Sequence, residues 1–439
     1  MKTAKYVFVV CLTTIFLFGC VFAPSPKYPL PADTVQPATF VPSPTLRPRV
    51  STPIATPITD PDKVVTFASI GLESAVRETI NKPEGDIFRK DVFLIEHLSA
   101  DRRQIDSLEG IQDLENLTDL WLTNNDIVDL GPLRNLRKLT KLVLWSNRIS
   151  DIGPLRSLTQ LEWLKLDNNP VSDLEPLESL TSLRELYVVD TQVLEDISPI
   201  RNLVGLNVLY LSENKISDIA PLSQMRNLQD LSLRDNNIVD ISPLEKLPLM
   251  SLSLSDNKIK NFEPISKMTN LRTLLISHTG FSDANLLSEL PLTKLDLGIN
   301  NLIDVAPLSN LVGLTHLSLN YNEITDISPL SKLTNLIWLD ISNNQVTDIS
   351  SLSWLTNLTQ LHLSDNPITD INPLTDLSLE GLYLENTNIS DIRPLRKMKD
   401  LDILWLTGNQ ITDFSPLYDI PSLSLWVNGE IVVLPTPAN

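Results

Sequence analysis

Apolar residues recur along most of the chain in a pattern with a period of 22 residues and slips of one. Counted from its first leucine, a unit has apolar residues at positions 1, 4, 7, 9, 14, 17 and 20, with Asn at 12, Asp at 16 and Pro at 19. One unit reads Leu114, Leu117, Leu120, Leu122, Asn125, Ile127, Asp129, Leu130, Pro132 and Leu133. Later units begin at Leu136, Leu158, Leu180, Leu203, Met225, Leu247, Met268, Leu290, Leu311, Leu333, Leu355, Leu377 and Met398. A degenerate copy starts at Val92 and a truncated one at Ile420, so about fifteen copies are expected.

The pattern changes period inside each unit. In Leu120-Trp121-Leu122 it has period two, which predicts a short strand with both leucines on one side and Trp121 on the other. A single coil of this size is too thin to bury its own leucines, so the coils must stack.

Two polar positions are expected to serve the scaffold. The Asn at position 12 can bond the backbone where the chain turns inward, giving a ladder of Asn side chains, with weaker steps at Thr191, Thr279 and Thr387. The Asp at position 16 precedes a Pro-containing turn and fits a helical cap, while Asn261 interrupts the Asp series. A calcium-binding row of carboxylates is the alternative, but no Gly-rich calcium consensus accompanies it.

The repeat resembles the leucine-rich repeat, and within it the 22-residue class of bacterial internalins, over residues 92–427. The resemblance implies an α/β solenoid: a right-handed arc with a parallel β-sheet on the concave face and short 3-10 or turn segments on the convex face. A helical N-cap is expected over residues 63–91, where Leu72–Ile80 has an amphipathic pattern. The resemblance also implies a binding scaffold that recognises proteins through its concave face.

The N-terminus predicts export. Lys2 and Lys5 precede an apolar run too short for a membrane span, which gives a signal peptide over residues 1–19. Leu17-Phe18-Gly19-Cys20 resembles a lipoprotein processing site, which implies that Cys20 carries fatty acyl groups such as palmitate. We expect a membrane-anchored lipoprotein at the bacterial cell surface; a secreted protein is the alternative.

Three further segments complete the predicted organisation. The lipidated Cys and a Pro/Thr/Ser-rich linker occupy residues 20–62, whose composition cannot build a core. The repeats occupy residues 92–419. Residues 420–439 hold the truncated repeat and a C-terminal cap that reads as a hairpin around Asn428-Gly429.

Aromatic residues occupy repeat positions that the core does not need. Positions 6, 8 and 10 are expected to face the concave side, and six of the seven tryptophans fall on them; Trp354 does not. The predicted ligand-binding residues are Trp121, Trp145, Trp163, Tyr187, Tyr210, Trp338, His362, Tyr383 and Trp405, with His316 and Tyr321 near the last four. Large exposed aromatic groups anchor protein interfaces and also stack on sugars. Packing against neighbouring strands is the structural alternative.

Charge and composition limit the function further. The formal net charge of −19 argues against nucleic acid, and the membrane is expected to be contacted only through the lipid anchor. No nucleophile, phosphate-binding or metal-ligand motif is found, so we expect no enzyme, no cofactor and no metal. The predicted function is a monomeric protein-binding scaffold; the alternatives are a glycan-binding module, a spacer without a ligand, and a cytosolic phosphatase-regulating protein with similar repeats.

Overall fold

A computed structural model describes residues 58–420, 423–427 and 430–432 of the chain. The predicted signal peptide, Cys20 and most of the linker lie outside the described residues. Among the described residues, no helix combines the length and the apolar character that a membrane crossing needs.

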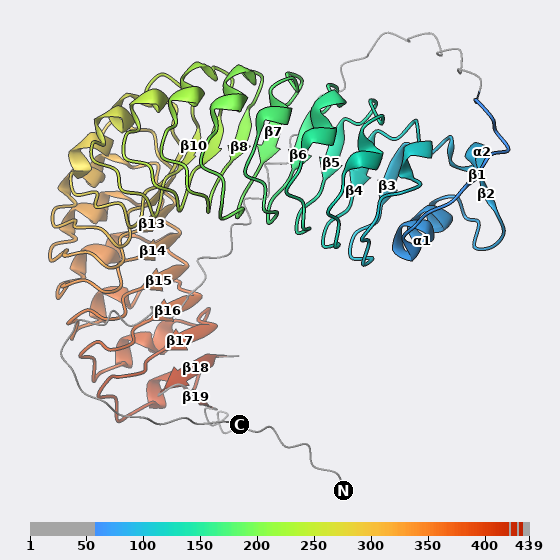
Figure 1. The fold of residues 1–439 in the computed structure, drawn as a ribbon. Coiled ribbons are helices and arrows are strands. Elements are labelled where there is room, and N and C mark those ends of the chain that lie inside the picture. Colours follow the sequence, from blue (N-terminus) through green and yellow to red (C-terminus); the bar gives the residue numbers. More distant parts are fainter. Residues whose placement is uncertain (1–57, 421–422, 428–429, 433–439) are drawn as a thin grey trace, which may run out of the picture. The chain divides into compact units, whose positions relative to one another are not determined.

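The repeats form a curved stack of coils with a continuous sheet along the inner side (Figure 1). Strands β3 to β18 pair in parallel with their neighbours in sequence order, and β19 pairs antiparallel with β18. The bounds are β3 (His97–Ser99), β4 (Asp119–Trp121), β5 (Lys141–Val143), β6 (Trp163–Lys165), β7 (Glu185–Tyr187), β8 (Val208–Tyr210), β9 (Asp230–Ser232), β10 (Ser251–Ser253), β11 (Thr273–Leu275), β12 (Lys294–Asp296), β13 (His316–Ser318), β14 (Trp338–Asp340), β15 (Gln360–His362), β16 (Gly381–Tyr383), β17 (Ile403–Trp405), β18 (Ser424–Val427) and β19 (Glu430–Val432).

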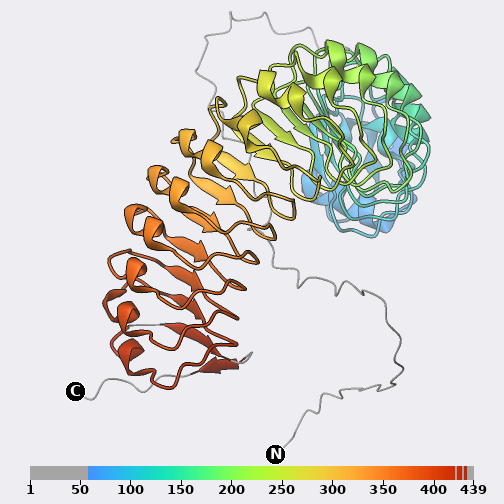
Figure 2. The ribbon, with the colours of Figure 1, turned by 90° about the vertical axis from the view of Figure 1, so that its left-hand side faces the viewer.

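Short 3-10 helices return the chain along the outer side, which is visible in both views (Figures 1 and 2). They are η1 (Ile111–Asp113), η2 (Gly131–Leu133), η3 (Gly153–Ser157), η4 (Glu175–Leu177), η5 (Ser198–Asn202), η6 (Ala220–Gln224), η7 (Ser242–Leu244), η8 (Glu263–Lys267), η9 (Ala284–Leu287), η10 (Ala306–Asn310), η11 (Ser328–Lys332), η12 (Ser350–Trp354), η13 (Asn372–Leu374), η14 (Arg393–Lys397) and η15 (Ser415–Leu417). The leucine-rich-repeat solenoid is therefore confirmed.

The core lies between the sheet and the 3-10 helices. The leucine in the middle of each strand, such as Leu120 or Leu231, is completely buried and lies in register with its counterpart on the next coil. The residues before and after it lie on the other side of the sheet, where most are at least partly exposed and a few, such as Val143, Asp296 and Asp340, are buried. The period of two within each strand thus separates core from concave surface, as predicted.

The Asn at position 12 forms the expected ladder. Asn169 donates from Nδ2 to the carbonyls of Leu144 and Leu166, at 2.8 and 3.1 Å, and accepts from the backbone N–H of Ile149 at 3.0 Å. One side chain therefore joins its own coil to the preceding one. Because buried backbone groups must be paired, this position tolerates few other residues.

Where threonine replaces asparagine in this ladder, the hydrogen bonds between the coils change. Thr191 donates from Oγ1 to Asn214 Oδ1 at 2.6 Å and accepts from the backbone N–H of Leu194. At Thr279, Asn300 of the next coil instead accepts the nearby backbone N–H groups. The neighbouring asparagine therefore compensates for much of the missing amide.

The Asp at position 16 caps the outer turn. Asp129 Oδ1 accepts from the backbone N–H two residues later, at 2.7 Å, and the same bond recurs from Asp151 to Asp413. Asn261 makes it too, accepting from Glu263 N–H at 3.0 Å. Asn261 interrupts the Asp series in the sequence but keeps the cap, because an amide oxygen accepts this bond as a carboxylate does.

The ends of the stack are covered. On the N-terminal side lie α1 (Ile70–Thr79), α2 (Arg89–Val92) and the antiparallel pair β1 (Val64–Val65) and β2 (Ile87–Phe88). Leu72 and Val76 of α1 are buried in the core that continues into the repeats. On the C-terminal side, the β18–β19 hairpin extends the sheet by one antiparallel strand.

Candidate functional site: the concave aromatic surface

Positions 6 and 8 of the repeat form the floor of the concave face. They flank the buried strand leucine, so their side chains project away from the core. Strand pairing brings equal positions of successive coils next to each other, for example Trp405 beside Tyr383 and Trp426. Residues at the same repeat position on successive coils therefore form one row along the solenoid.

The N-terminal aromatic cluster consists of five residues on five consecutive coils: Trp121, Trp145, Trp163, Tyr187 and Tyr210. Tyr187 and Tyr210 meet edge to face with ring centroids 5.1 Å apart. Lysine ammonium groups lie over two rings, Lys165 over Tyr187 at 4.4 Å and Lys141 over Trp163 at 5.9 Å. In the described part of the chain, the three tryptophans take no part in ring–ring contacts.

Some polar groups of this cluster form hydrogen bonds with neighbouring side chains. Tyr187 donates to Glu185 Oε2 and Tyr210 donates to Asp230 Oδ2, both at 2.9 Å. Burial, followed by the nearby Glu185 carboxylate, raises the pKa of Tyr187. Trp163 differs, because its buried Nε1 donor has no hydrogen-bond partner among the described residues.

The C-terminal aromatic row consists of Trp338, His362, Tyr383, Trp405 and Trp426. His362 and Tyr383 are stacked, with centroids 4.0 Å apart and planes inclined by 6°. Trp405 and Trp426 are stacked at 4.8 Å and 15°, and tilted contacts join Trp338 to His362 and Tyr383 to Trp405. Five side chains from five coils thus form one continuous row.

The residues of this row differ from those that were grouped together from the sequence. Trp426 completes the row although it was not among the predicted binding residues, and only its repeat position pointed to it. His316 and Tyr321 make no ring contact with the row in the described residues. His316 bonds Thr315 Oγ1 through Nδ1 at 2.9 Å, and Tyr321 lies on the turn after β13.

Burial changes the acid–base behaviour of His362. Desolvation lowers its pKa to about 4, because the rings on either side exclude water from the charged form. Desolvation also lowers the pKa of His316, with Lys294 adding to the effect. Both imidazoles are therefore neutral at pH 7, and His362 adds no charge to the C-terminal aromatic row.

Between the two aromatic groups the concave face is small and polar. Toward the C-terminal aromatic row, the buried polar residues Asp296, Ser318 and Asp340 are aligned on β12, β13 and β14. We call these three residues the acidic floor. Burial is the largest cause of a raised pKa in both aspartates, and the charge of Asp340 further raises that of Asp296.

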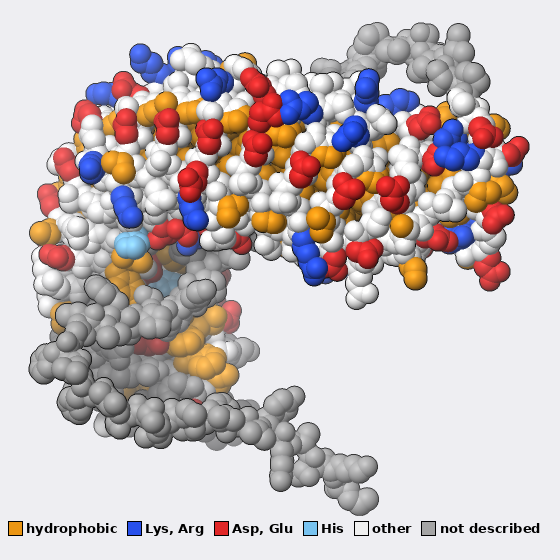
Figure 3. All heavy atoms as spheres, in the orientation of Figure 1, with side chains coloured by type: hydrophobic (Ala, Val, Ile, Leu, Met, Phe, Trp, Pro, Cys, Tyr) orange, Lys and Arg blue, Asp and Glu red, His pale blue; other side chains and the backbone are white. Residues whose placement is uncertain are grey.

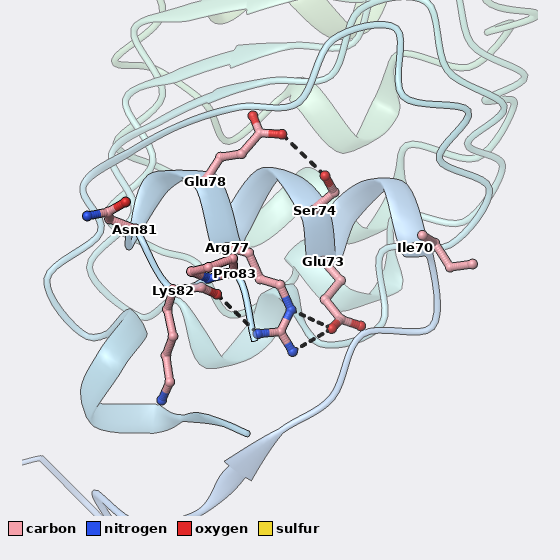
Figure 4. Close-up of a pocket in the computed structure, with 8 residues that line it drawn as sticks. All are labelled: Ile70, Glu73, Ser74, Arg77, Glu78, Asn81, Lys82 and Pro83. Atoms are coloured by element: carbon pink, nitrogen blue, oxygen red, sulfur yellow. Dashed lines mark hydrogen bonds and ion pairs between the residues drawn. The ribbon is translucent and has the colours of Figure 1, made fainter. Parts of the chain in front are cut away.

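A surface indentation also lies along α1, away from the aromatic surface. Its lining includes Ile70, Glu73, Arg77 and Lys82 (Figure 4). Arg77 bonds Glu73 Oε1 at 2.8 Å and the carbonyls of Lys82 and Gly85, so its polar groups are engaged within the cap.

Ionisable side chains are dispersed elsewhere. Acidic and basic groups are interspersed over the visible outer surface of the coils (Figure 3). Within the described residues, no group of three His, Cys, Asp or Glu side chains could hold a metal ion. Among the described residues, the aromatic surface is therefore the candidate site, because the scaffold itself does not require these side chains.

Comparison with known families agrees with the geometry. A model described as leucine-rich repeats in two copies matches residues 115–157, 137–179, 159–202, 204–246, 292–332, 334–376 and 377–419. The chain belongs to the leucine-rich-repeat family. No curated protein sequence matches it.

Several solved structures are similar to this leucine-rich-repeat protein. An internalin (inlF) from Listeria monocytogenes is 31% identical, with a TM-score of 0.55 over 82% of this chain and 95% of the internalin. A leucine-rich-repeat protein of Leptospira interrogans is 23% identical, with a TM-score of 0.66 over 77% of this chain and 97% of that one. The plant peptide hormone receptor RGFR1, solved in complex with RGF2, is 20% identical, with a TM-score of 0.57 over 77% of this chain and 63% of the receptor. The chain is therefore an internalin-like leucine-rich-repeat protein.

Proposed function

We propose that the protein is a non-catalytic scaffold at the cell surface that binds a protein ligand through its concave face. The observation that carries the proposal is the gathering of aromatic side chains at positions 6, 8 and 10, where the repeat requires none. Partly exposed Trp and Tyr side chains are the residues that most often anchor protein interfaces. The similar receptor structure was solved with a peptide hormone, which is in keeping with a polypeptide ligand.

In the C-terminal aromatic row, the arrangement of the rings favours a protein over a glycan. Sugars stack on open aromatic faces, whereas in the C-terminal aromatic row the faces of His362 and Tyr383 cover each other, as do those of Trp405 and Trp426. What such a row offers to a ligand is largely ring edges and grooves between them. Apolar side chains of a protein fit such a surface.

The N-terminus supports a location outside the cytoplasm. A signal peptide over residues 1–19 and acylation of Cys20 would anchor the chain, and the Pro-rich linker would hold the repeats away from the membrane. Replacement of Cys20 by Ser should release the protein from the membrane fraction, and unchanged fractionation would contradict the anchor.

The binding proposal is tested with two variants in which tryptophan is replaced by alanine. Trp121, Trp145 and Trp163 are replaced together by Ala in one variant, and Trp354 alone is replaced in the control. Trp354 is 68% exposed and lies on η12, at the outer side of the coils. Both proteins, checked for folding by circular dichroism, are used to capture partners from surface extracts of candidate target cells.

We expect a specific set of captured proteins that the triple variant loses and the Trp354 variant retains. A glycan array with the same proteins tests the carbohydrate alternative. If the triple variant captures the same proteins as the wild type, this part of the concave face is not the binding surface.

A further inference from the structure

A groove at the N-terminal end of α1 lies apart from the concave aromatic surface. It has a volume of about 830 Å³. One wall is the first turn of the helix, with Ser69, Ile70 and Gly71, and the other is the loop after β3, with Arg102 and Asp106. Ile70 also borders the indentation along α1 (Figure 4), so the groove lies where the helix begins.

The first turn of α1 has hydrogen-bond donors without acceptors. The first bond of the helix runs from the Glu73 N–H to the Ser69 carbonyl, at 3.0 Å. Within the described residues, no acceptor contacts the backbone N–H groups of Ile70 and Gly71, which come before it. Such N–H groups and the helix dipole give this end a partial positive charge, and helix N-termini bind anions for that reason.

Ser69 distinguishes this helix end from an ordinary one. It occupies the N-cap position, where a serine side chain usually accepts a bond from a backbone N–H of the first turn. The Ser69 hydroxyl forms no such bond, and it has no other hydrogen-bond partner in the described part of the chain, although Ser69 is only 4% exposed. Buried hydroxyls normally have a partner, and the groove that Ser69 lines is the side from which one can approach.

The opposite wall is fixed by contacts that leave Arg102 available. Arg103 pairs with Glu78 of α1, with 2.6 Å between Nη2 and Oε2. A Cβ atom at Gly71 would lie 2.1 Å from the Arg103 carbonyl oxygen, so only glycine lets the helix approach the loop this closely. Arg102 is exposed and forms no ion pair within the described residues. The groove therefore combines fixed walls with one unpaired cation.

Two carboxylates also border the groove. Asp101 Oδ1 accepts from the Thr123 N–H at 2.6 Å, which engages this carboxylate with the next coil. Asp106 is exposed, and its side chain has no hydrogen bond among the described residues. Because its charge repels an anion, replacing Asp106 should have the opposite effect on anion binding to replacing Arg102.

We propose that this groove binds the phosphate group of a ligand. The phosphate oxygens accept from the N–H groups of Ile70 and Gly71, from the Ser69 hydroxyl and from the Arg102 guanidinium. These donors come from both walls, which suits a tetrahedral group with oxygens in several directions better than a planar carboxylate. The site lies outside the concave face and does not depend on the function proposed above.

Isothermal titration calorimetry of the purified full chain with inorganic phosphate tests the site. The variants are Ser69→Ala, Arg102→Gln and Asp106→Asn, and the control is Arg137→Gln. Arg137 is also exposed but lies outside the groove, so the control removes the same charge elsewhere. Because neither the Ser69 hydroxyl nor the Arg102 guanidinium has a partner in the described residues, replacing them should not change the thermal unfolding temperature without phosphate.

We expect the affinity for phosphate to fall at least about tenfold in Arg102→Gln and about fivefold in Ser69→Ala, because each change removes a hydrogen bond to a charged group. Asp106→Asn should bind phosphate about threefold more tightly, and Arg137→Gln should stay within about twofold of the wild type. Phosphate should raise the unfolding temperature of the wild type and the control more than that of the two weakened variants.

Two results would overturn the proposal: no binding of phosphate by the wild type, or equal affinities of the wild type, Ser69→Ala and Arg102→Gln. Acetate and glycerol 3-phosphate are titrated in the same way. Acetate that binds as tightly as phosphate would show a carboxylate site and contradict the phosphate assignment. Competition by glycerol 3-phosphate would support the site and identify an esterified phosphate, such as a lipid headgroup carries, whereas binding of inorganic phosphate alone would support it for the free ion.

Discussion

Replacing His362 by Phe should remove a specific sensitivity of the fold to acid. His362 is held between Trp338 and Tyr383, and burial lowers its pKa from 6.5 to about 4. In the unfolded chain the imidazole keeps its ordinary pKa. Above pH 6.5 it is neutral in both states and affects stability little; as the pH falls toward 4, the unfolded chain binds a proton that the folded chain rejects.

The size of the effect follows from the two pKa values. A pKa difference of one corresponds to about 1.4 kcal/mol, so the wild type should lose about 2 kcal/mol between pH 7 and pH 5 and about 3 kcal/mol by pH 4. These losses are relative to His362→Phe, which keeps an aromatic ring in the row but cannot titrate. The comparison cancels the titration of the carboxylates, which both proteins share.

The assay is urea unfolding of both proteins at several pH values. Because stacked repeats can unfold in parts, hydrogen exchange of the amides in β15 and β16 should accompany it and show the same trend. If the free energies of unfolding of the two proteins fall in parallel between pH 7 and pH 4, His362 is not desolvated and the row does not pack as described.

Three further predictions concern the scaffold and the acidic floor. Replacing Asn236 by Ala should lower the free energy of unfolding by about 3 kcal/mol, because buried backbone groups on two coils lose their partners. Asn236→Thr should cost less, since the next coil has Asn257 at this position, as Asn214 follows Thr191; equal urea midpoints for all three proteins would contradict the ladder. Replacing Asp240, which accepts from Ser242 N–H at 2.9 Å, by Ala should cost about 1 kcal/mol and by Asn much less, as measured by thermal unfolding; a similar loss in both would show that the cap is not the cause. Because burial raises the pKa of Asp296, its charged form destabilises the fold as the pH rises, so Asp296→Asn should increase stability at pH 7 and less so near pH 4; a gain that does not depend on pH would point to packing instead.

Much of this architecture could be predicted from sequence because each repeat position has one physical task. Leu120 must be buried, and Asn125 must bond two coils. The same task is repeated on every coil, so a weak local signal is reinforced many times. Even the helical cap over Ile70–Thr79 follows from an amphipathic pattern.

The contacts within the concave surface were harder to predict. Repeat position shows that Trp405 and Trp426 are neighbours, but not that their rings stack, because ring orientation depends on rotamers and on neighbouring side chains. Asp296 and Asp340 follow the strand leucine at position 8, which is expected to face the concave side, but the sequence gives no sign of their burial. That burial depends on contacts between coils, such as Asn320 packed against Gly298 beside Asp296, which a one-dimensional pattern does not contain.

Site-specific photo-crosslinking tests the central claim most directly. A photo-reactive amino acid is placed at Trp145 or Trp405 on the concave face, and at Trp354 on the outer side as the control, in the full chain exposed to intact target cells. We expect one set of proteins to be crosslinked from the concave positions and not from Trp354, as identified by mass spectrometry. Crosslinks that form equally from Trp354, or only from it, would contradict the claim that the concave aromatic surface is the binding site.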